Sequence, residues 1–505
     1  MKRLRYIIRF FLVTALLLGY SSCKPKEPEF PVTPSLDPSE EELVKKDKDY
    51  LAKVALRDEY MEVYYYWADN VSSRNRQYKP YKYSSIYDWF DALLYTPTDR
   101  WSWMEDKESY AASQTGTIGG EGTWGISVKQ PADDDDFRVF VSRVIKGSPL
   151  ERFGVTRGAQ LKCINDLDIT DGFSTQNQID KFNKYMSNKT ATFCFRLTDG
   201  RDTSFAAAMV SSLSTNYILK TAIYTNEDFP GLKEPVGYFH YMSFNANFID
   251  DIHGEMAKFK AAGVKKMIVD LRYNGGGDSR ASDALMGYLA PKSAIGKPYV
   301  TRTHNRQLFR SNKTQYIPNL EGNLGLDEVF FIMHSGSASA SEMTFNGLRP
   351  YLKDKLHHVG GQSYGKPNGM YVLYYPTSDE VFNEVSEGNY SKLQYVFYPI
   401  SFYNLNSEGE QIPSGAEAGS GFVPDFAVDD DIFHDFGPEE ADIKACLNYI
   451  AYGTFESAQD VEAVHTKSNA GNKGIKAIFS EEETDPHYGK CYLPLPEEFR
   501  KRNNF

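Results

Sequence analysis

A short apolar segment that runs directly into a stretch of small residues constrains this 505-residue chain more than any other part of its sequence. Residues 329–333 have the length and the β-branched and aromatic content of a buried strand. Ser, Gly and Ala follow, and a helical pattern begins near Ser339, with Met343, Phe345 and Leu348 available for burial. The first N–H groups of a helix lack intrahelical acceptors and can stabilise an anion. A serine at this strand-to-helix junction, with small neighbours that admit a substrate carbonyl, is well placed to act as a nucleophile.

Ser339 needs a base, because a serine hydroxyl is a weak nucleophile until its proton is removed. The candidate is Lys366, in a glycine-rich turn after the strand-like residues 356–359. A free lysine, with a pKa near 10.4, is neutral in about one molecule in 2,500 at pH 7. Burial can lower that pKa by several units because desolvation penalises the ammonium form. A Ser–Lys site therefore requires a dry pocket, which the flanking Val, Leu and Tyr residues could supply.

The same segments admit other interpretations. The serines and glycines could form an ordinary loop beside a solvated lysine, and His334, His357 or His358 could serve as the base instead of Lys366. The glycine-rich turn also matches the first part of a phosphate-binding P-loop. Pro367 stands where a Ser or Thr would have to hold magnesium, so we do not expect nucleotide binding.

The charge of the chain argues against one class of partner, and its N-terminus indicates a protein that acts outside the cytoplasm. The net charge is −12 and no basic stripe appears beyond the N-terminus, which argues against nucleic acid as a partner. Basic residues open the chain, and the apolar segment 10–18 is too short to span a bilayer. Small residues lead to Cys23, so residues 1–23 resemble a bacterial lipoprotein signal peptide whose cysteine becomes lipidated, the alternative being a simple signal peptide with a spare cysteine.

Residues 24–38 are rich in proline and charge and are expected to act as a linker between this N-terminus and the folded chain. We therefore expect an exported protein that is lipid-anchored in the bacterial cell envelope, on the periplasmic side or the outer surface.

Neither a disulfide pairing nor a metal site follows from the sequence. Cys163, Cys194, Cys446 and Cys491 could form disulfides in an oxidising compartment, but which of them pair is open. No Cys/His spacing has the pattern of a zinc site, and the aspartates at 133–136 fit a solvated loop better than a calcium site. We therefore predict no metal.

The character of the sequence changes along the mature chain and predicts a multidomain α+β protein. Residues 39–115 have helical patterns, and we expect their aromatic residues to pack against the next domain. Residues 116–208 contain short strand-like segments and turns. Residues 209–455 alternate strands with helices, as in an α/β core whose helices cover a sheet, and residues 456–505 are a polar C-terminal tail.

Two motifs resemble the signature of the C-terminal processing (tail-specific) serine peptidases. They are the segment 337–342 (Ser-Ala-Ser-Ala-Ser-Glu) and the turn 364–366 (Tyr-Gly-Lys). The resemblance implies that Ser339 is the nucleophile, that Lys366 is the base and that no cofactor is needed. It also implies an N-terminal helical cap, a PDZ-like β-rich domain and a crotonase-like or ClpP-like α/β peptidase core.

A glycine triplet at 275–277, after the strand-like residues 267–271, fits the same family. Glycine N–H groups can point at a ligand because no Cβ blocks its approach. In the peptidases that the chain resembles, this segment and the residue after the nucleophile stabilise the oxyanion. The resemblance therefore implies that the N–H groups of Gly276 and Ala340 have this role.

Residues 116–208 resemble a PDZ domain of the bacterial protease type. The resemblance rests on the Gly-Ser-Pro segment that starts at Gly147 and on the Gly-x-x-Leu-x-x-Ile-Asn pattern that starts at Gly158. Such a domain captures the end of another chain by adding it as a strand. The resemblance implies that the N–H groups near Trp124, Gly125 and Ile126 receive the terminal carboxylate.

One departure from the family supports a rival interpretation. Family members commonly place a glutamine four residues after the lysine, where it orients the amine, and this chain has Met370 there. Gln362, Asn368 or Tyr371 could substitute for it. The resemblance implies an endopeptidase whose partners are unfolded or tail-exposed polypeptides of the envelope. The rival is a non-catalytic lipoprotein of the same fold that holds peptides.

Overall fold

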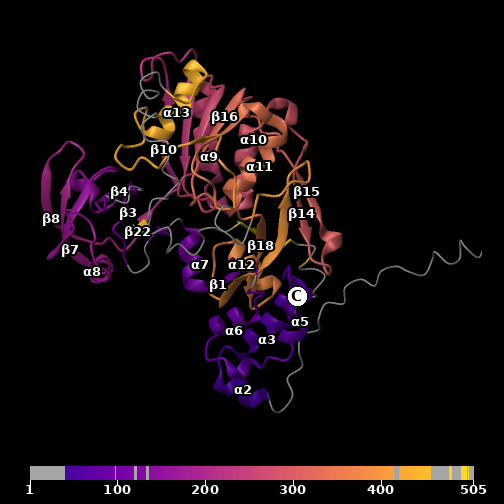
Figure 1. The fold of residues 1–505 in the computed structure, drawn as a ribbon. Helices are drawn as coiled ribbons and strands as arrows, with labels where there is room; N and C mark the ends of the chain where they lie inside the picture. Colours follow the sequence, from indigo (N-terminus) through magenta and orange to yellow (C-terminus); the bar gives the residue numbers. More distant parts are fainter. Residues whose placement is uncertain are drawn as a thin grey trace, which may run out of the picture.

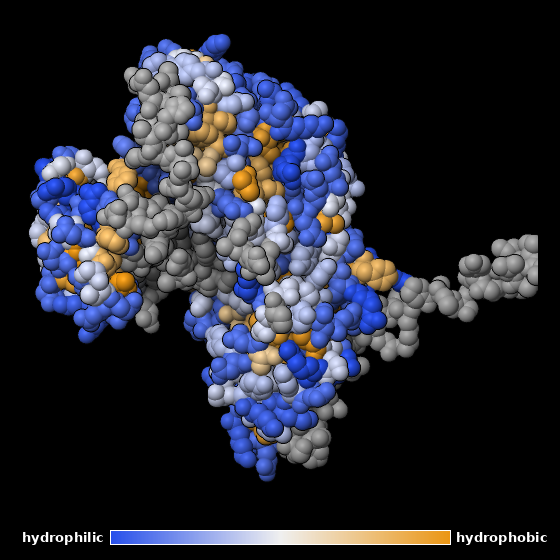
Figure 2. Space-filling view, viewed as in Figure 1, coloured by the Kyte–Doolittle hydropathy of each residue, from blue (hydrophilic) through white to orange (hydrophobic). Residues whose placement is uncertain are grey.

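The computed structural model describes residues 40–96, 98–115, 117–118, 122–131, 136–414, 420–456, 477–479, 491–496 and 499. Within these residues the chain forms a helical region, a β-rich unit and a larger α/β unit (Figure 1). The face seen in Figure 2 is largely hydrophilic, with apolar residues in small scattered patches. The predicted signal peptide with Cys23, the proline-rich linker and most of the aspartate-rich loop lie outside the described residues. No helix in the described part of the chain is long and apolar enough to cross a membrane.

The N-terminal region is helical, as predicted. Ser85 and Asp106 accept hydrogen bonds from the backbone N–H groups of Asp88 and Ser109, which satisfies donors that the start of a helix leaves unpaired. The α-helices are α2 (Glu40–Lys46), α3 (Tyr50–Ala55), α4 (Met61–Val63), α5 (Ala68–Asn75), α6 (Ile86–Leu93) and α7 (Lys107–Gln114).

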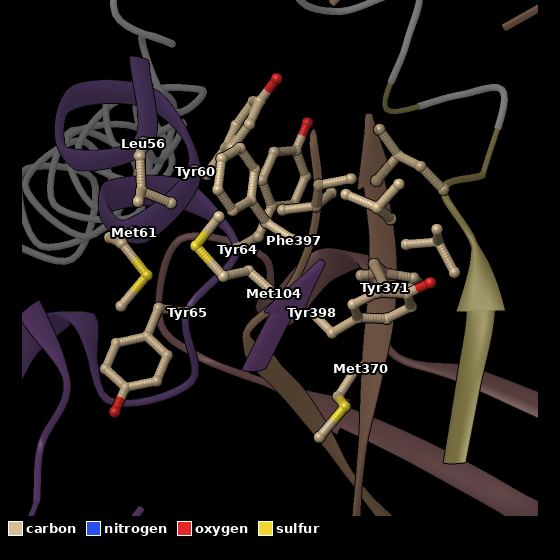
Figure 3. Packing of buried hydrophobic residues seen from close by; sticks show 14 of the residues in the cluster. Leu56, Tyr60, Met61, Tyr64, Tyr65, Met104, Met370, Tyr371, Phe397 and Tyr398 are labelled. Carbon is tan, nitrogen blue, oxygen red and sulfur yellow. The ribbon is translucent and has the colours of Figure 1, made fainter. Parts of the chain in front are cut away.

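The aromatic side chains of this region pack on a sheet from much later in the chain, and not on the β-rich unit that follows them in sequence. Strand β1 (Trp103–Asp106) pairs with β19 (Tyr395–Tyr398), and the ring of Trp103 stacks on that of Tyr398 at 4.1 Å. Tyr60 on the helical side meets Phe397 on the sheet in the same buried cluster (Figure 3). The predicted packing of these aromatic residues against the next domain in sequence is therefore wrong, because the pairing of β1 with β19 places them on the later sheet.

The β-rich unit is an antiparallel sheet with the strand order β22-β3-β4-β5-β7-β8. Its core contains Trp124, Ile126 and Phe193, all fully buried. Cys163 and Cys194 lie opposite each other on β5 and β7 and form a disulfide. The elements are β3 (Ile126–Lys129), β4 (Val139–Val144), β5 (Gln160–Ile164), β6 (Leu167–Asp168), α8 (Gln176–Met186), β7 (Thr190–Arg196), β8 (Asp202–Ala208) and β22 (Ala477–Phe479).

The α/β unit contains a sheet with the strand order β10-β11-β12-β16-β17-β21, in which every pair from β11 onward is parallel. Helices α9, α10 and α11 bury side chains on one face and α13 on the other, so the strands read as continuous apolar segments. The strands are β10 (Ile218–Tyr224), β11 (Val236–Tyr241), β12 (Lys266–Asp270), β16 (Glu328–Met333), β17 (Leu356–Gly360) and β21 (Phe426–Ala427). The helices are α9 (Ile249–Ala261), α10 (Ser279–Leu289), α11 (Ala340–Leu352) and α13 (Ala441–Tyr452).

A further sheet joins the α/β unit to the helical region, with the order β1-β19-β18-β20-β14-β15. Beside this path, β23 pairs with both β13 and β18. The other strands of this sheet are β13 (Gly277–Asp278), β14 (Pro298–His304), β15 (Lys313–Tyr316), β18 (Asn368–Tyr375), β20 (Ile400–Leu405) and β23 (Cys491–Pro494).

Candidate active site

Ser339 lies at the junction of β16 and α11, as the sequence predicts. Its backbone has φ 60° and ψ −106°, a region that non-glycine residues rarely occupy and that costs of order 1–3 kcal/mol. The residue is 1% exposed, and its hydroxyl has no hydrogen-bond partner among the described residues. A strained backbone that holds a buried, unengaged hydroxyl is typical of a functional position.

The two neighbouring serines have structural partners instead. Ser337 donates its hydroxyl to the carbonyl of Leu271 at 2.8 Å, and Ser341 donates to the carbonyl of Asn274 at 2.9 Å. Both bonds tie the start of α11 to the segment that follows β12. Of the three serines in the motif, Ser339 is therefore the one whose hydroxyl remains available for chemistry.

The buried carboxylate of Glu342 joins the serine segment to the lysine turn. Its Oε2 accepts the backbone N–H groups of Ser339 and Lys366, both at 2.9 Å. Its Oε1 accepts the hydroxyl of Ser363 and the N–H of Gly365, both at 2.6 Å. Each of these two backbone nitrogens lies 2.9 Å from the same oxygen atom, so the backbone nitrogens of Ser339 and Lys366 are close to each other.

Burial raises the pKa of the Glu342 carboxyl above its ordinary value, and the four hydrogen bonds that it accepts each oppose that rise. The bonds compensate a buried acceptor whose oxygens would otherwise face no donor. The sequence shows this glutamate only as the last residue of the serine motif and does not indicate a role for it. The sequence signal that could have indicated this role is the position of Glu342, which lies both in the serine motif and in the first turn of the predicted helix.

Lys366 is fully buried in the turn between β17 and β18. Gly365 has φ 87°, and a Cβ there would lie 2.6 Å from the backbone nitrogen of Gly421, so the turn requires a glycine. The N–H of Tyr364 donates to the carbonyl of Ser337 at 3.0 Å, a second anchor beside Glu342. The dry surroundings that a Ser–Lys pair requires are thus present around this lysine.

The glycine triplet reaches the site through Asn274. The carbonyl of Asn274 accepts the N–H of Ala338 at 3.1 Å, and its Oδ1 accepts the N–H of Gly276 at 2.9 Å. The N–H predicted to stabilise the oxyanion is therefore engaged in this structure and would have to leave Asn274 first. Ala340, the other predicted donor, is the first residue of α11, where an N–H has no acceptor within the helix.

The proposed substitutes for the missing glutamine differ in their surroundings. Met370 is fully buried in the aromatic cluster of Figure 3. The hydroxyl of Tyr371 is hydrogen-bonded to Nε2 of His304 at 2.7 Å. Asn368, two residues after Lys366, is buried.

The three histidines considered as alternative bases have partners elsewhere. His334 Nε2 lies 3.0 Å from Oδ1 of Asp442, and His357 Nε2 lies 3.1 Å from Oε1 of Glu328. Burial lowers the pKa of His358 to about 4. None of them is hydrogen-bonded to the Ser339 hydroxyl within the described residues.

The residues expected to receive a peptide carboxylate lie at the start of β3. The side chains of Trp124 and Ile126 belong to the core of the β-rich unit, and the indole N–H of Trp124 donates to the carbonyl of Met186 at 2.9 Å. The N–H of Gly125 donates to the hydroxyl of Thr123 at 2.9 Å. The edge of β3 beyond them is paired with β22, so this edge can hold an extended strand.

Asp430, Glu440 and Asp442 form a buried acidic cluster that arginines neutralise. Arg272 contacts all three carboxylates, with an Nη1–Oδ2 distance of 2.8 Å to Asp442. Arg157 of the β-rich unit donates to Asp430 at 2.7 Å. The cluster is an ion-pair network, and the sequence, in which its members lie far apart, gave no signal for it.

Comparisons with known proteins show similarity to peptidases. The sequence model of peptidase family S41 matches residues 235–392, and that of the peptidase S41 N-terminal domain matches residues 58–103. A crystal structure of a putative S41 protease from Bacteroides fragilis has 18% identity and a TM-score of 0.58, over 78% of this chain and 96% of that one. The photosystem II D1 C-terminal processing protease has 15% identity and a TM-score of 0.45, over 76% of this chain and 94% of that one.

The fold is therefore a multidomain α+β fold of the S41 protease kind, and the protein is a serine-type peptidase. The chain is similar to peptidase family S41 over residues 235–392 and to the S41 N-terminal domain over residues 58–103.

Proposed function

We propose that this peptidase is an endopeptidase that cleaves with a Ser339–Lys366 dyad. The observation that carries the proposal is the Glu342 carboxylate, which holds the backbones of both residues through one oxygen atom. The unengaged Ser339 hydroxyl and the complete burial of Lys366 support the same roles. Burial favours the neutral amine that a general base requires.

In the proposed reaction, Ser339 Oγ attacks the scissile carbonyl while the amine of Lys366 takes its proton. The N–H of Ala340 stabilises the tetrahedral oxyanion, joined by the N–H of Gly276 once it leaves Asn274. Each such donor is typically worth about 100- to 1,000-fold in turnover. Lys366 then gives the proton to the leaving amine, and water hydrolyses the acyl-enzyme with the same lysine as base. No cofactor takes part.

We infer that the substrates are unfolded or tail-exposed polypeptides of the cell envelope, bound by the PDZ-like residues 116–208. The pairing of β22 with β3 supports this, because it is an antiparallel strand addition whose chain runs from Lys129 toward the loop at Trp124. The Cys163–Cys194 disulfide indicates an extracytoplasmic location. We include lipid anchoring through Cys23 in the proposal.

The dyad is tested with a fluorophosphonate probe and with an unstructured protein substrate. Wild type should label and cleave, whereas Ser339→Ala should do neither. Lys366→Met, which keeps the length of the side chain, should lose at least about 100-fold in rate. The control Lys355→Met changes an exposed lysine beside β17 and should leave the rate unchanged.

Two outcomes would contradict the proposal in different ways. If wild type neither labels nor cleaves but binds peptides, the non-catalytic interpretation, which the buried Met370 favours, is correct. If Lys366→Met keeps full turnover, one of the three histidines is the base.

A further inference from the structure

The last strand in the described part of the chain, β23, lies between the two segments that carry the candidate site. β23 pairs in parallel with β13, Gly277 opposite Cys491, and on its other edge with β18, Met370 opposite Tyr492. Figure 3 shows it in yellow beside the strand of Met370 and Tyr371. β13 begins directly after Gly276, and β18 begins two residues after Lys366. In the described residues, β23 thus forms a direct strand connection between these two segments.

Three of the described residues in and after β23 are built into the core. Tyr492, Leu495 and Phe499 are 7%, 4% and 1% exposed and belong to the cluster that the N-terminal helices cover. The carbonyl of Tyr492 accepts the hydroxyl of Ser279 at 3.3 Å, just after β13.

Phe499 adds contacts to the helical region and to the strand that follows Lys366. Its ring packs at 5.5 Å from that of Tyr371 and at 6.1 Å from that of Tyr64. The C-terminal segment thus contacts the oxyanion side, the lysine strand and the helical region together. A bound substrate would not be expected to bury itself this completely, since it must also leave.

We propose that residues 491–496 and Phe499 are a positioning element of the active site, which rests on the proposed roles of Ser339 and Lys366. β23 fixes the spacing between the Gly276 turn and the Lys366 strand by pairing with both β13 and β18, in addition to the link that runs through Asn274, the start of α11 and Glu342. The enzyme then becomes fully active only when this segment has docked. An inhibitory strand that blocks the site would have the opposite effect, and the experiment separates the two.

The experiment compares the full chain with two variants of one residue in the middle of β23. Leu493→Pro removes a backbone N–H and prevents regular pairing, whereas Leu493→Ala leaves the backbone intact and serves as the matched control. We expect at least a 100-fold loss in the rate of fluorophosphonate labelling and in kcat/KM for Leu493→Pro, and less than a threefold change for Leu493→Ala. Far-UV circular dichroism and the thermal midpoint report whether each variant is folded.

A chain that ends at residue 490 provides the second measurement. A synthetic peptide of residues 488–505, added in trans, should restore labelling to it in a saturable way, whereas a peptide of the same composition in scrambled order should not. The control chain that ends at Phe499 should have wild-type activity. Restored labelling distinguishes a missing strand from a misfolded enzyme.

Three results would overturn the inference. Folded Leu493→Pro with wild-type labelling shows that β23 only packs, and increased labelling shows that it inhibits. Failure of the peptide to restore labelling to the shortened chain contradicts a positioning role. If wild type itself does not label while Ser339→Ala is folded, the proposed dyad has failed, which is a separate outcome from failure of the positioning element.

Discussion

The most informative single change is Glu342→Gln, because it keeps the shape of the side chain and removes one acceptor. The carboxylate accepts four hydrogen bonds, two at each oxygen. An amide group offers one acceptor oxygen, and its NH₂ must face two of the four donors. The variant therefore has a predictable cost at the point where the serine and lysine segments meet.

The smallest cost follows if the NH₂ takes the place of Oε1. The Ser363 hydroxyl can then turn to accept, but the N–H of Gly365 loses its acceptor while buried. A buried donor without a partner costs about 1–3 kcal/mol, and the remaining bonds lose the extra strength of a charged acceptor. A total of about 3 kcal/mol corresponds to roughly a hundredfold loss in rate if it appears in the geometry of the transition state.

Labelling of Ser339 by a fluorophosphonate and turnover of an unstructured protein measure the effect. The matched control is Glu328→Gln, at the far end of β16, whose carboxylate pairs with Lys266 and His357. It should lower stability and leave turnover within about threefold. A folded Glu342→Gln enzyme that labels at the wild-type rate would refute the argument that this carboxylate holds the site together.

Three further predictions concern stability and peptide binding. Burial lowers the pKa of His358 to about 4 from about 6.5 in the unfolded chain, so the unfolded chain binds the proton first on acidification. The free energy of unfolding should fall by up to about 3 kcal/mol between pH 6.5 and 4, and urea titrations of His358→Phe should lack that part of the slope; an unchanged slope would contradict it. Arg157→Met leaves the buried Asp430 without one of its cations and should destabilise by about 3–5 kcal/mol in urea, and a change below 1 kcal/mol would show that the other partners suffice. Ile478→Pro should release the edge of β3 and tighten binding of an added extended peptide, measured by fluorescence anisotropy, and weaker binding would mean that β22 is not a competitor.

Local patterns were enough to predict the parts of the site that are close in sequence. The apolar run before Ser339 became β16, and the helix after it became α11, because a buried parallel strand and an amphipathic helix each impose their own period on a few consecutive residues. The glycine-rich turn at Lys366 was also predictable from local sequence, because glycine favours a turn. Gly365 adopts a positive φ there, next to a close backbone contact.

The sequence by itself therefore determined which residues could react and which short elements carry them. The tertiary structure alone decided that Glu342 binds both segments and that β23 joins β13 to β18. Each of these depends on groups that are separated along the chain or on the choice among several possible acceptors. Hydrogen bonds and strand pairs of this kind form only after the chain has packed, because burial removes water as the competing partner and leaves each polar group to find one within the fold.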